Sequence, residues 1–155
     1  MEIKVCEARD FLKLAPLALS WEQTCNAVEF GIKARAATFL ADVQGMVMSE
    51  SADVVVMGDG LRVYGLLGIL YRRNPIGDGL IANEHYWYVM PEHRGKESLK
   101  MLSMATELAK ARGCSHIIFT ANTLASDLHD SVCRIYERMG ARKFETSYIK
   151  QLGGR

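Results

Sequence analysis

The sequence predicts a single mixed α/β domain, spanning residues 1–155, in which helices cover a mostly antiparallel sheet. Its length suits one hydrophobic core, since 49% of the 155 residues are hydrophobic and 24% are charged. Three β-rich segments joined by tight turns fill residues 54–90, which indicates an antiparallel meander. Helical and strand-like segments then alternate, which indicates a parallel strand pair joined by a crossover helix. The predicted order is β-α-α-β-β-β-α-β-α-β.

The first part of the chain is expected to hold one strand and two helices. Residues 2–7 alternate polar and apolar side chains, as a strand does. Asp10 is a candidate N-cap for a helix at about residues 11–20, in which Pro16 should cause a kink or a break. Apolar residues at helical spacing predict a second helix at about residues 33–47.

The meander follows from β-branched runs separated by turn residues. Residues 54–57 precede a Gly-Asp-Gly sequence, which is typical of a hairpin turn. The return strand is expected at residues 63–71, and Asn, Pro, Gly and Asp residues at 74–79 indicate the next turn. A third strand, rich in aromatic residues, is expected at residues 80–90.

The remainder of the chain changes to a helical period and back. Helices are predicted at about residues 95–111 and 126–139, and each is followed by a glycine suited to a helix C-cap. A short buried strand at residues 116–120 separates them, and a final strand is predicted at residues 144–149.

The charge and the cysteines argue against several classes of protein. A formal net charge of +1 gives no electrostatic case for binding nucleic acid or a membrane. Four cysteines lie far apart without a CxxC pair, so no metal site is expected and a reducing, cytoplasmic setting fits. No apolar run approaches the ~18 residues of a membrane span, and the N-terminus lacks a signal-peptide pattern.

Residues 89–98, with the sequence VMPEHRGKES, are the most informative about function. They connect a predicted strand to a predicted helix, where free backbone N–H groups and the helix dipole favour an anion. Arg94 and Lys96 add positive charge, and Gly95 permits close approach of the backbone to a ligand. These features suit a pyrophosphate, although an ordinary strand-to-helix turn with a solvated basic cluster fits the spacing equally well.

This segment resembles the acyl-CoA loop of the GNAT acetyltransferase superfamily, which usually has valine, proline and an acidic residue before Arg-Gly-x-Gly-x-Gly or Ala. The string IYERMGA, residues 135–141, resembles the later helix of that family, in which a tyrosine precedes a glycine by four residues. The element order matches over nearly the whole chain. The resemblance implies a sheet splayed between strands 4 and 5. It also implies transfer of an acetyl group from acetyl-CoA to a primary amine, by direct attack on the thioester. The compact sequence, with its degenerate loop, further resembles acetyltransferase-like proteins of bacteriophages.

The resemblance assigns catalytic roles to three side chains. Tyr136 is the expected general acid that protonates the departing thiolate, although its spacing from Val132 and Met139 also suits a core tyrosine. Glu84 and His85 are candidate bases for the acceptor amine. Their side chains should point to opposite faces of the strand, so at most one faces the cleft, and Glu84 is preferred. A solvated glutamate and a packed histidine are the alternative.

The resemblance also assigns contacts with acetyl-CoA. A backbone N–H near Tyr88 or Val89 is expected to polarise the thioester carbonyl. Asn122 is expected to contact the pantetheine arm, unless it caps a turn. The expected cofactor-binding residues are Tyr88, Val89, Met90, Arg94, Gly95, Lys96, Glu97, Ser98 and Asn122.

Two residues depart from the family pattern, since Glu97 and Leu99 stand where small residues are usual. Leu99 is expected to crowd the cofactor. The Glu97 carboxylate should repel phosphates unless it turns outward or pairs with Arg94 or Lys96. The alternative function is therefore a GNAT-fold binding or structural protein without catalysis. The acceptor, a small molecule or a protein, and the formation of a homodimer stay open.

Overall fold

The computed structural model describes the backbone of residues 1–153 and their side chains except those of residues 125–127. It contains a five-stranded sheet in the order β1-β2-β3-β4-β5, antiparallel throughout except for the parallel pair β4–β5. The strands are β1 (Glu2–Val5), β2 (Ala52–Gly58), β3 (Val63–Arg73), β4 (Leu80–Val89) and β5 (Cys114–Ile118). The α-helices are α1 (Ala15–Thr24), α2 (Ala36–Val47), α3 (Lys96–Ala111) and α4 (His129–Arg138). The 3-10 helices are η1 (Ala8–Leu14), η2 (Ala27–Phe30), η3 (Pro91–His93) and η4 (Thr123–Leu128).

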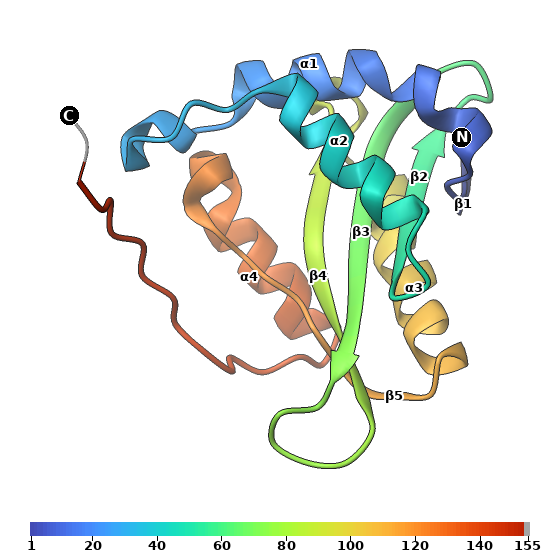
Figure 1. The fold of residues 1–155 in the computed structure, drawn as a ribbon, viewed down its shortest axis with the longest axis vertical. Helices are drawn as coiled ribbons and strands as arrows, with labels where there is room; N and C mark the ends of the chain where they lie inside the picture. The colour runs from blue at the N-terminus through green and yellow to red at the C-terminus, as the bar shows by residue number, and fades with distance from the viewer. Residues whose placement is uncertain (154–155) are drawn as a thin grey trace.

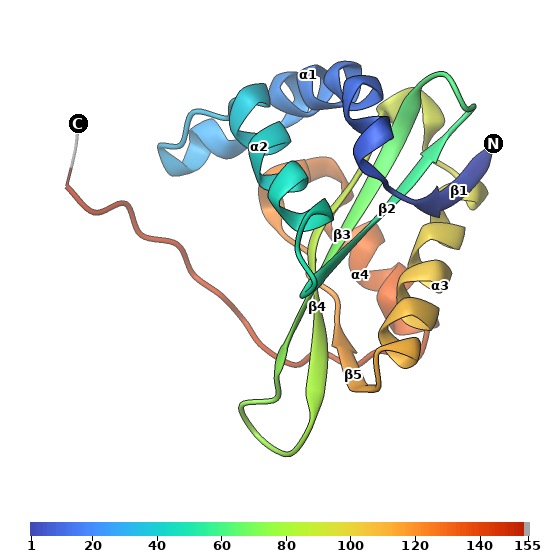
Figure 2. The same ribbon diagram turned by 45° about the vertical axis from the view of Figure 1, so that its right-hand side comes forward.

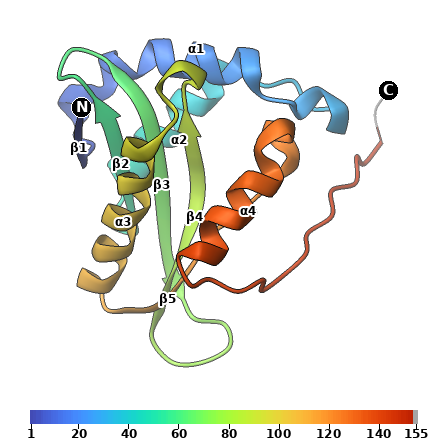
Figure 3. The ribbon, with the colours of Figure 1, turned by 180° about the vertical axis from the view of Figure 1, so that it is seen from behind.

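Helices cover both faces of the sheet and give the domain two hydrophobic layers. Helices α1 and α2 lie on one face (Figure 1), and α3 and α4 lie on the other (Figure 3). In β2, Val54 and Val56 belong to the core beneath α1 and α2, whereas Val55 and Met57 belong to the core beneath α3. The β-branched run is therefore buried on both sides, as the alternation of side chains along a strand requires. None of the helices within residues 1–153 has both the length and the apolar character needed to cross a bilayer.

The segment after β1 differs from the sequence prediction. Residues 8–14 form η1, and Pro16 lies in the first turn of α1, where its missing N–H removes no helical hydrogen bond. Pro16 therefore marks the start of a helix and does not interrupt one. Asp10 is not the N-cap of that helix. It is the third residue of η1, and its carboxylate accepts a hydrogen bond from the N–H of Glu7 at 3.1 Å.

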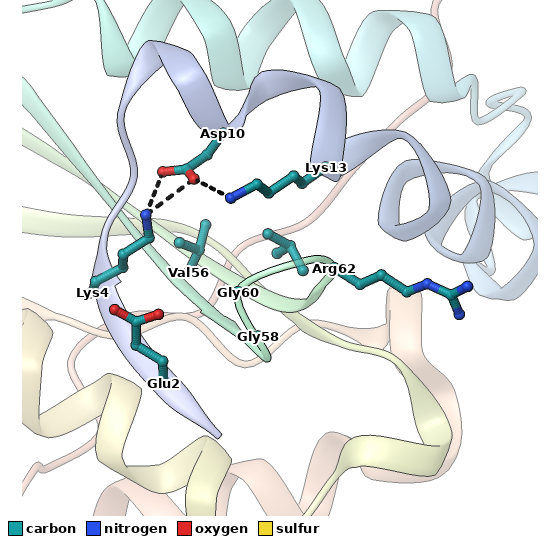
Figure 4. A pocket seen from close by; sticks show the side chains of 9 residues that line it. Glu2, Lys4, Asp10, Lys13, Val56, Gly58, Gly60 and Arg62 are labelled. Atoms are coloured by element: carbon teal, nitrogen blue, oxygen red, sulfur yellow. Dashed lines mark hydrogen bonds and ion pairs between the residues drawn. The ribbon is translucent and has the colours of Figure 1, made fainter.

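Asp10 joins β1 to η1 through a buried carboxylate. It is 0% exposed and forms ion pairs with Lys4 at 2.9 Å and Lys13 at 3.2 Å (Figure 4). Burial by itself raises the pKa of Asp10, but hydrogen bonds from Lys4, Glu7 and Lys13 outweigh it and lower the pKa to about 2. The folded state therefore favours the ionised carboxylate.

We expect Asp10→Ala to lower the free energy of unfolding by about 2–4 kcal/mol at neutral pH, because it removes a buried, fully bonded carboxylate. Since the folded pKa lies below the unfolded one, this stability is present above about pH 4 and is lost as the pH falls toward 2. Urea unfolding of both proteins at neutral pH and near pH 3 measures the effect. Glu2→Ala, an exposed change beside the same ion pairs, is the control. Equal stability of the wild type and Asp10→Ala at neutral pH contradicts this account.

The predicted final strand is wrong. Residues 144–149 have no regular secondary structure and do not join the sheet. After α4 the chain runs along the outside of the molecule, away from β5 (Figures 1 and 2). Phe144, Tyr148 and Ile149 are 62%, 94% and 59% exposed. The β-propensity of this segment meets no partner strand, and propensity without pairing and packing does not make a strand.

Candidate active site

The strands β4 and β5 separate halfway along β4, as predicted. Their parallel ladder runs from Leu80 opposite Cys114 to Asn83 opposite Ile118. Strand β4 then continues to Val89 with no strand beside it on that side within residues 1–153. Helix α4 lies alongside this part of β4 (Figure 3). The separation leaves one backbone edge of β4 unpaired from Glu84 onward.

A β-bulge lies at the point of separation. Glu84 pairs with Ile69 and Tyr86 pairs with Gly68, so His85 is an extra residue on β4. The bulge turns both His85 and Tyr86 toward α2, where each hydrogen-bonds Asp42 Oδ2, at 2.9 and 2.8 Å. Glu84 faces the opposite side of the sheet, toward α4. Glu84 and His85 therefore lie on opposite faces, and only Glu84 reaches the opening between β4 and β5.

Glu84 and Tyr136 form a buried pair at this opening. The hydroxyl of Tyr136, on α4, donates a hydrogen bond of 2.7 Å to Glu84 Oε2. Tyr136 is only 7% exposed and Glu84 only 8%. The backbone N–H of Thr120, just beyond β5, lies near the Glu84 carboxylate and lowers its pKa. One carboxylate thus links β4, α4 and the end of β5.

Burial sets the protonation of this pair. It raises the pKa of Glu84 to about 7, and the hydrogen bond from Tyr136 and the nearby Thr120 N–H only partly offset it. Burial and the neighbouring Glu84 charge raise the pKa of Tyr136 well above its usual value. At neutral pH, Glu84 therefore divides between acid and base forms while Tyr136 keeps its proton. Such a pair suits proton transfer.

Aromatic side chains pack against the ring of Tyr136. Phe119 stacks on its ring with centroids 5.0 Å apart, and the Trp87 ring lies 6.0 Å away. Gly140 follows α4 with φ 88°, a left-handed value that glycine adopts without strain and that ends the helix. Tyr136 is therefore a core residue, as its spacing from Val132 and Met139 suggests, and its hydroxyl contacts an ionisable group.

The loop after β4 leads into an open helix N-terminus. Ser98 Oγ accepts a hydrogen bond from the N–H of Gly95 at 3.3 Å, and the Ser98 N–H donates to the Gly95 carbonyl at 3.1 Å. The first N–H groups of α3, at Lys96 and Glu97, have no partner within the helix. A Cβ added at Gly95 meets no atom within 4 Å. The backbone at Gly95 is therefore uncrowded, and the N–H groups of Lys96 and Glu97 have no helical acceptor that competes with an anion.

Glu97 and Leu99, the two departures from the family pattern, both have solvent-exposed side chains on the surface of α3. Both carboxylate oxygens of Glu97 accept hydrogen bonds of 2.8 Å from Lys100, which lower the pKa of Glu97. The negative charge is paired along the outer surface of α3, not with Arg94 or Lys96. Leu99 is 38% exposed and lies on the surface of the helix.

The unpaired edge of β4 presents the N–H of Val89. The N–H of Met90 donates to the Tyr64 carbonyl of β3 at 2.9 Å. Because antiparallel partners alternate between bonded and non-bonded pairs, Tyr88 also turns its N–H toward β3, while Val89 turns away from it. Arg94 Nε donates to the Val89 carbonyl on that same edge at 2.9 Å. Of the two predicted donors for the thioester carbonyl, only Val89 faces the opening.

Two other predicted site residues lie in different surroundings. Asn122 accepts a hydrogen bond from the Leu124 N–H at 3.0 Å and caps η4, which agrees with the turn interpretation. The hydroxyl of Tyr88 bonds Ser20 at 2.7 Å and Thr24 at 2.8 Å, on the face covered by α1. Neither side chain reaches the Glu84–Tyr136 pair. Met90 follows the last residue of β4, and its N–H donates to the Tyr64 carbonyl of β3.

Sequence reasoning missed two residues that lie next to the Glu84–Tyr136 pair, Phe119 beside Tyr136 and Thr120 beside Glu84. The predicted strand at residues 116–120 included both residues. The actual β5 ends at Ile118, and this early end frees them to contact Tyr136 and Glu84. The apolar run His-Ile-Ile-Phe-Thr contains no residue that marks where pairing stops, so the sequence carries no signal for this shift.

No family model matches the sequence, and no curated protein matches it. Solved structures do match the fold. A ribosomal-protein-alanine N-acetyltransferase from Brucella melitensis biovar Abortus 2308 has a TM-score of 0.73 and 18% identity, over 98% of this chain and 100% of the other. A GNAT family acetyltransferase from Staphylococcus aureus has a TM-score of 0.68 and 14% identity, over 97% and 98%. An aminoglycoside acetyltransferase from an uncultured soil metagenomic sample has a TM-score of 0.70 and 16% identity, over 99% and 100%.

Proposed function

From the GNAT acetyltransferase fold of this chain, we propose that it transfers an acetyl group from acetyl-CoA to a primary amine. The observation that carries the proposal is the buried Glu84–Tyr136 hydrogen bond at the separation of β4 and β5. The reaction uses a base and an acid, because one proton leaves an amine and another reaches a thiolate, and this pair supplies both. A purely structural tyrosine does not require a buried carboxylate whose pKa is raised to about 7.

Acetyl-CoA binds, in this proposal, with its diphosphate at the N-terminus of α3. The N–H groups of Lys96 and Glu97 supply hydrogen bonds, and the side chains of Arg94 and Lys96 supply positive charge. The pantetheine arm lies along the unpaired edge of β4. The N–H of Val89 then donates to the thioester carbonyl oxygen, where negative charge develops during attack.

The reaction needs one proton to leave the amine and one to reach sulfur. The neutral amine nitrogen attacks the thioester carbon, a C–N bond forms, and the C–S bond breaks. Glu84 accepts the proton released by the amine, and Tyr136 donates its phenolic proton to the departing thiolate. Glu84 then returns a proton to Tyr136 across their 2.7 Å hydrogen bond, and the pair regains its first state. Both side chains are buried, and the substrates approach them, in this proposal, along the unpaired edge of β4.

Calorimetry with acetyl-CoA tests the binding step. We expect saturable binding to the wild type, and Arg94→Ala should weaken it about 10- to 100-fold, because charge-assisted contacts with a diphosphate are lost. Lys110→Ala is the matched control, since Lys110 lies in the last turn of the same helix and pairs with Glu107. Acetyl-pantetheine, which lacks the diphosphate, should bind the wild type and Arg94→Ala equally weakly.

The same titration separates the proposal from its alternative. A protein that kept the fold but lost catalysis and ligand binding shows no heat of binding and no thermal shift with acetyl-CoA. Equal weakening by Arg94→Ala and Lys110→Ala also contradicts the proposed diphosphate site, because it indicates only a general effect of charge.

A further inference from the structure

Trp87 carries a polar atom that the fold leaves without a partner. Its indole Nε1 is buried, and within the part of the chain that the structure describes it has no hydrogen-bond partner. Native structures retain few buried donors of this kind, because an unpaired donor loses its bonds to water and gains nothing in return. A buried N–H without an acceptor therefore suggests that a ligand supplies one.

The position of Trp87 indicates which ligand. Trp87 lies on β4 beyond Asn83, the last residue that pairs with β5, so it borders the gap between the strands. Its side chain packs in the same core as Tyr136, with the ring centroids 6.0 Å apart. The indole ring thus lies beside the ring of Tyr136, which hydrogen-bonds Glu84.

We propose that the Trp87 indole N–H donates a hydrogen bond to a carbonyl oxygen of the acyl-pantetheine chain and positions the thioester beside Tyr136. This inference rests on the proposed function. The phosphates of acetyl-CoA belong at the charged end of the gap, whereas an uncharged indole N–H in apolar surroundings matches an uncharged carbonyl. Two kinds of carbonyl qualify, that of the thioester and those of the pantetheine amides.

The indole N–H signals in a proton–nitrogen NMR spectrum test this contact directly. The chain has two tryptophans, and the other, Trp21, stacks on Phe39 on the opposite face of the sheet at 4.9 Å. Acetyl-CoA should move the Trp87 signal downfield and slow its exchange with water, while the Trp21 signal stays in place. The variant Trp21→Phe assigns the two signals, so the test does not require that a Trp87 variant folds.

Trp87→Phe gives a second readout. Calorimetry should show acetyl-CoA binding about 3- to 10-fold weaker than in the wild type, as expected for one lost neutral hydrogen bond. Equal weakening for acetyl-CoA and CoA assigns the acceptor to a pantetheine amide, and weakening for acetyl-CoA alone assigns it to the thioester. Trp21→Phe is the control and should bind both ligands as the wild type does.

The outcomes distinguish this inference from the function on which it rests. A wild type that binds no acetyl-CoA overturns both. A wild type that binds acetyl-CoA while the Trp87 signal does not move overturns the Trp87 contact alone. Unchanged affinity of a folded Trp87→Phe protein for both ligands overturns it as well.

Discussion

Glu84→Gln is expected to slow acetyl transfer about 10²- to 10⁴-fold, because the amide keeps the shape of the carboxylate but cannot accept the proton of the amine. Affinity for acetyl-CoA should stay close to that of the wild type, since the diphosphate site is elsewhere. Release of the CoA thiol measures the rate, with acetyl-CoA and a panel of amines that includes a polyamine, an aminoglycoside and peptides. His85→Gln is the matched control, because His85 lies at the same bulge but on the opposite face. Since this variant keeps Glu84 as the base, we expect its rate of acetyl transfer to match that of the wild type.

Glu84→Gln should also change the pH dependence of stability. The folded pKa of Glu84, about 7, lies above its ordinary value of 4.5, so the folded state binds the proton more tightly than the unfolded state. Wild-type stability therefore falls as the pH rises from about 4.5 to about 7, by an amount of the order of 3 kcal/mol. The glutamine amide of the variant has no proton to lose in this range, so the variant should match the wild type near pH 4 and exceed it near pH 8.

Urea unfolding across this pH range measures the difference. Parallel stability curves for the wild type and Glu84→Gln contradict a buried, titrating Glu84. A variant that keeps full activity with the best amine of the panel contradicts its role as base, whatever the stability curves show. The two results are independent, because a residue can be costly to bury without taking part in the reaction.

The sequence predicts the fold well because its local signals are strong. The β-branched run at residues 54–57 and the glycine-rich turn after it leave little freedom for the meander, and the structure confirms both strands of that hairpin. The final strand fails for a physical reason, since residues 144–149 have the composition of a strand but find no partner to pair with. Pairing depends on the rest of the molecule, and a local pattern does not report it.

The candidate site is predictable in its residues but not in its contacts. The resemblance selected Glu84 and Tyr136 separately, and the sequence contains nothing that joins them across 52 positions. Their contact follows from the bulge at His85, which sets the face of Glu84, and from the early end of β5. A bulge changes the alternation by a single residue, and the sequence from 80 to 90 reads as an ordinary strand without it.

Tyr136→Phe is expected to slow acetyl transfer about 10²- to 10³-fold, because the phenol that donates a proton to the thiolate is lost. It should also lower the free energy of unfolding by about 1–3 kcal/mol near pH 8, where the ionised Glu84 loses its hydrogen-bond donor. The loss should be smaller near pH 5, where Glu84 is protonated. The Tyr136 hydroxyl lowers the pKa of Glu84, so its removal should raise that pKa. The fall in stability with rising pH should then extend to a higher pH than in the wild type.

The double variant Glu84→Gln/Tyr136→Phe tests whether the two residues act as one unit. If the proton moves through their hydrogen bond, the double variant should be little slower than the slower single variant, because either change already breaks the relay. Near pH 8, Tyr136→Phe should cost less stability in the Glu84→Gln background, where no buried charge loses its donor. Rate losses that multiply, together with stability losses that add, would indicate two side chains that share a hydrogen bond but act separately.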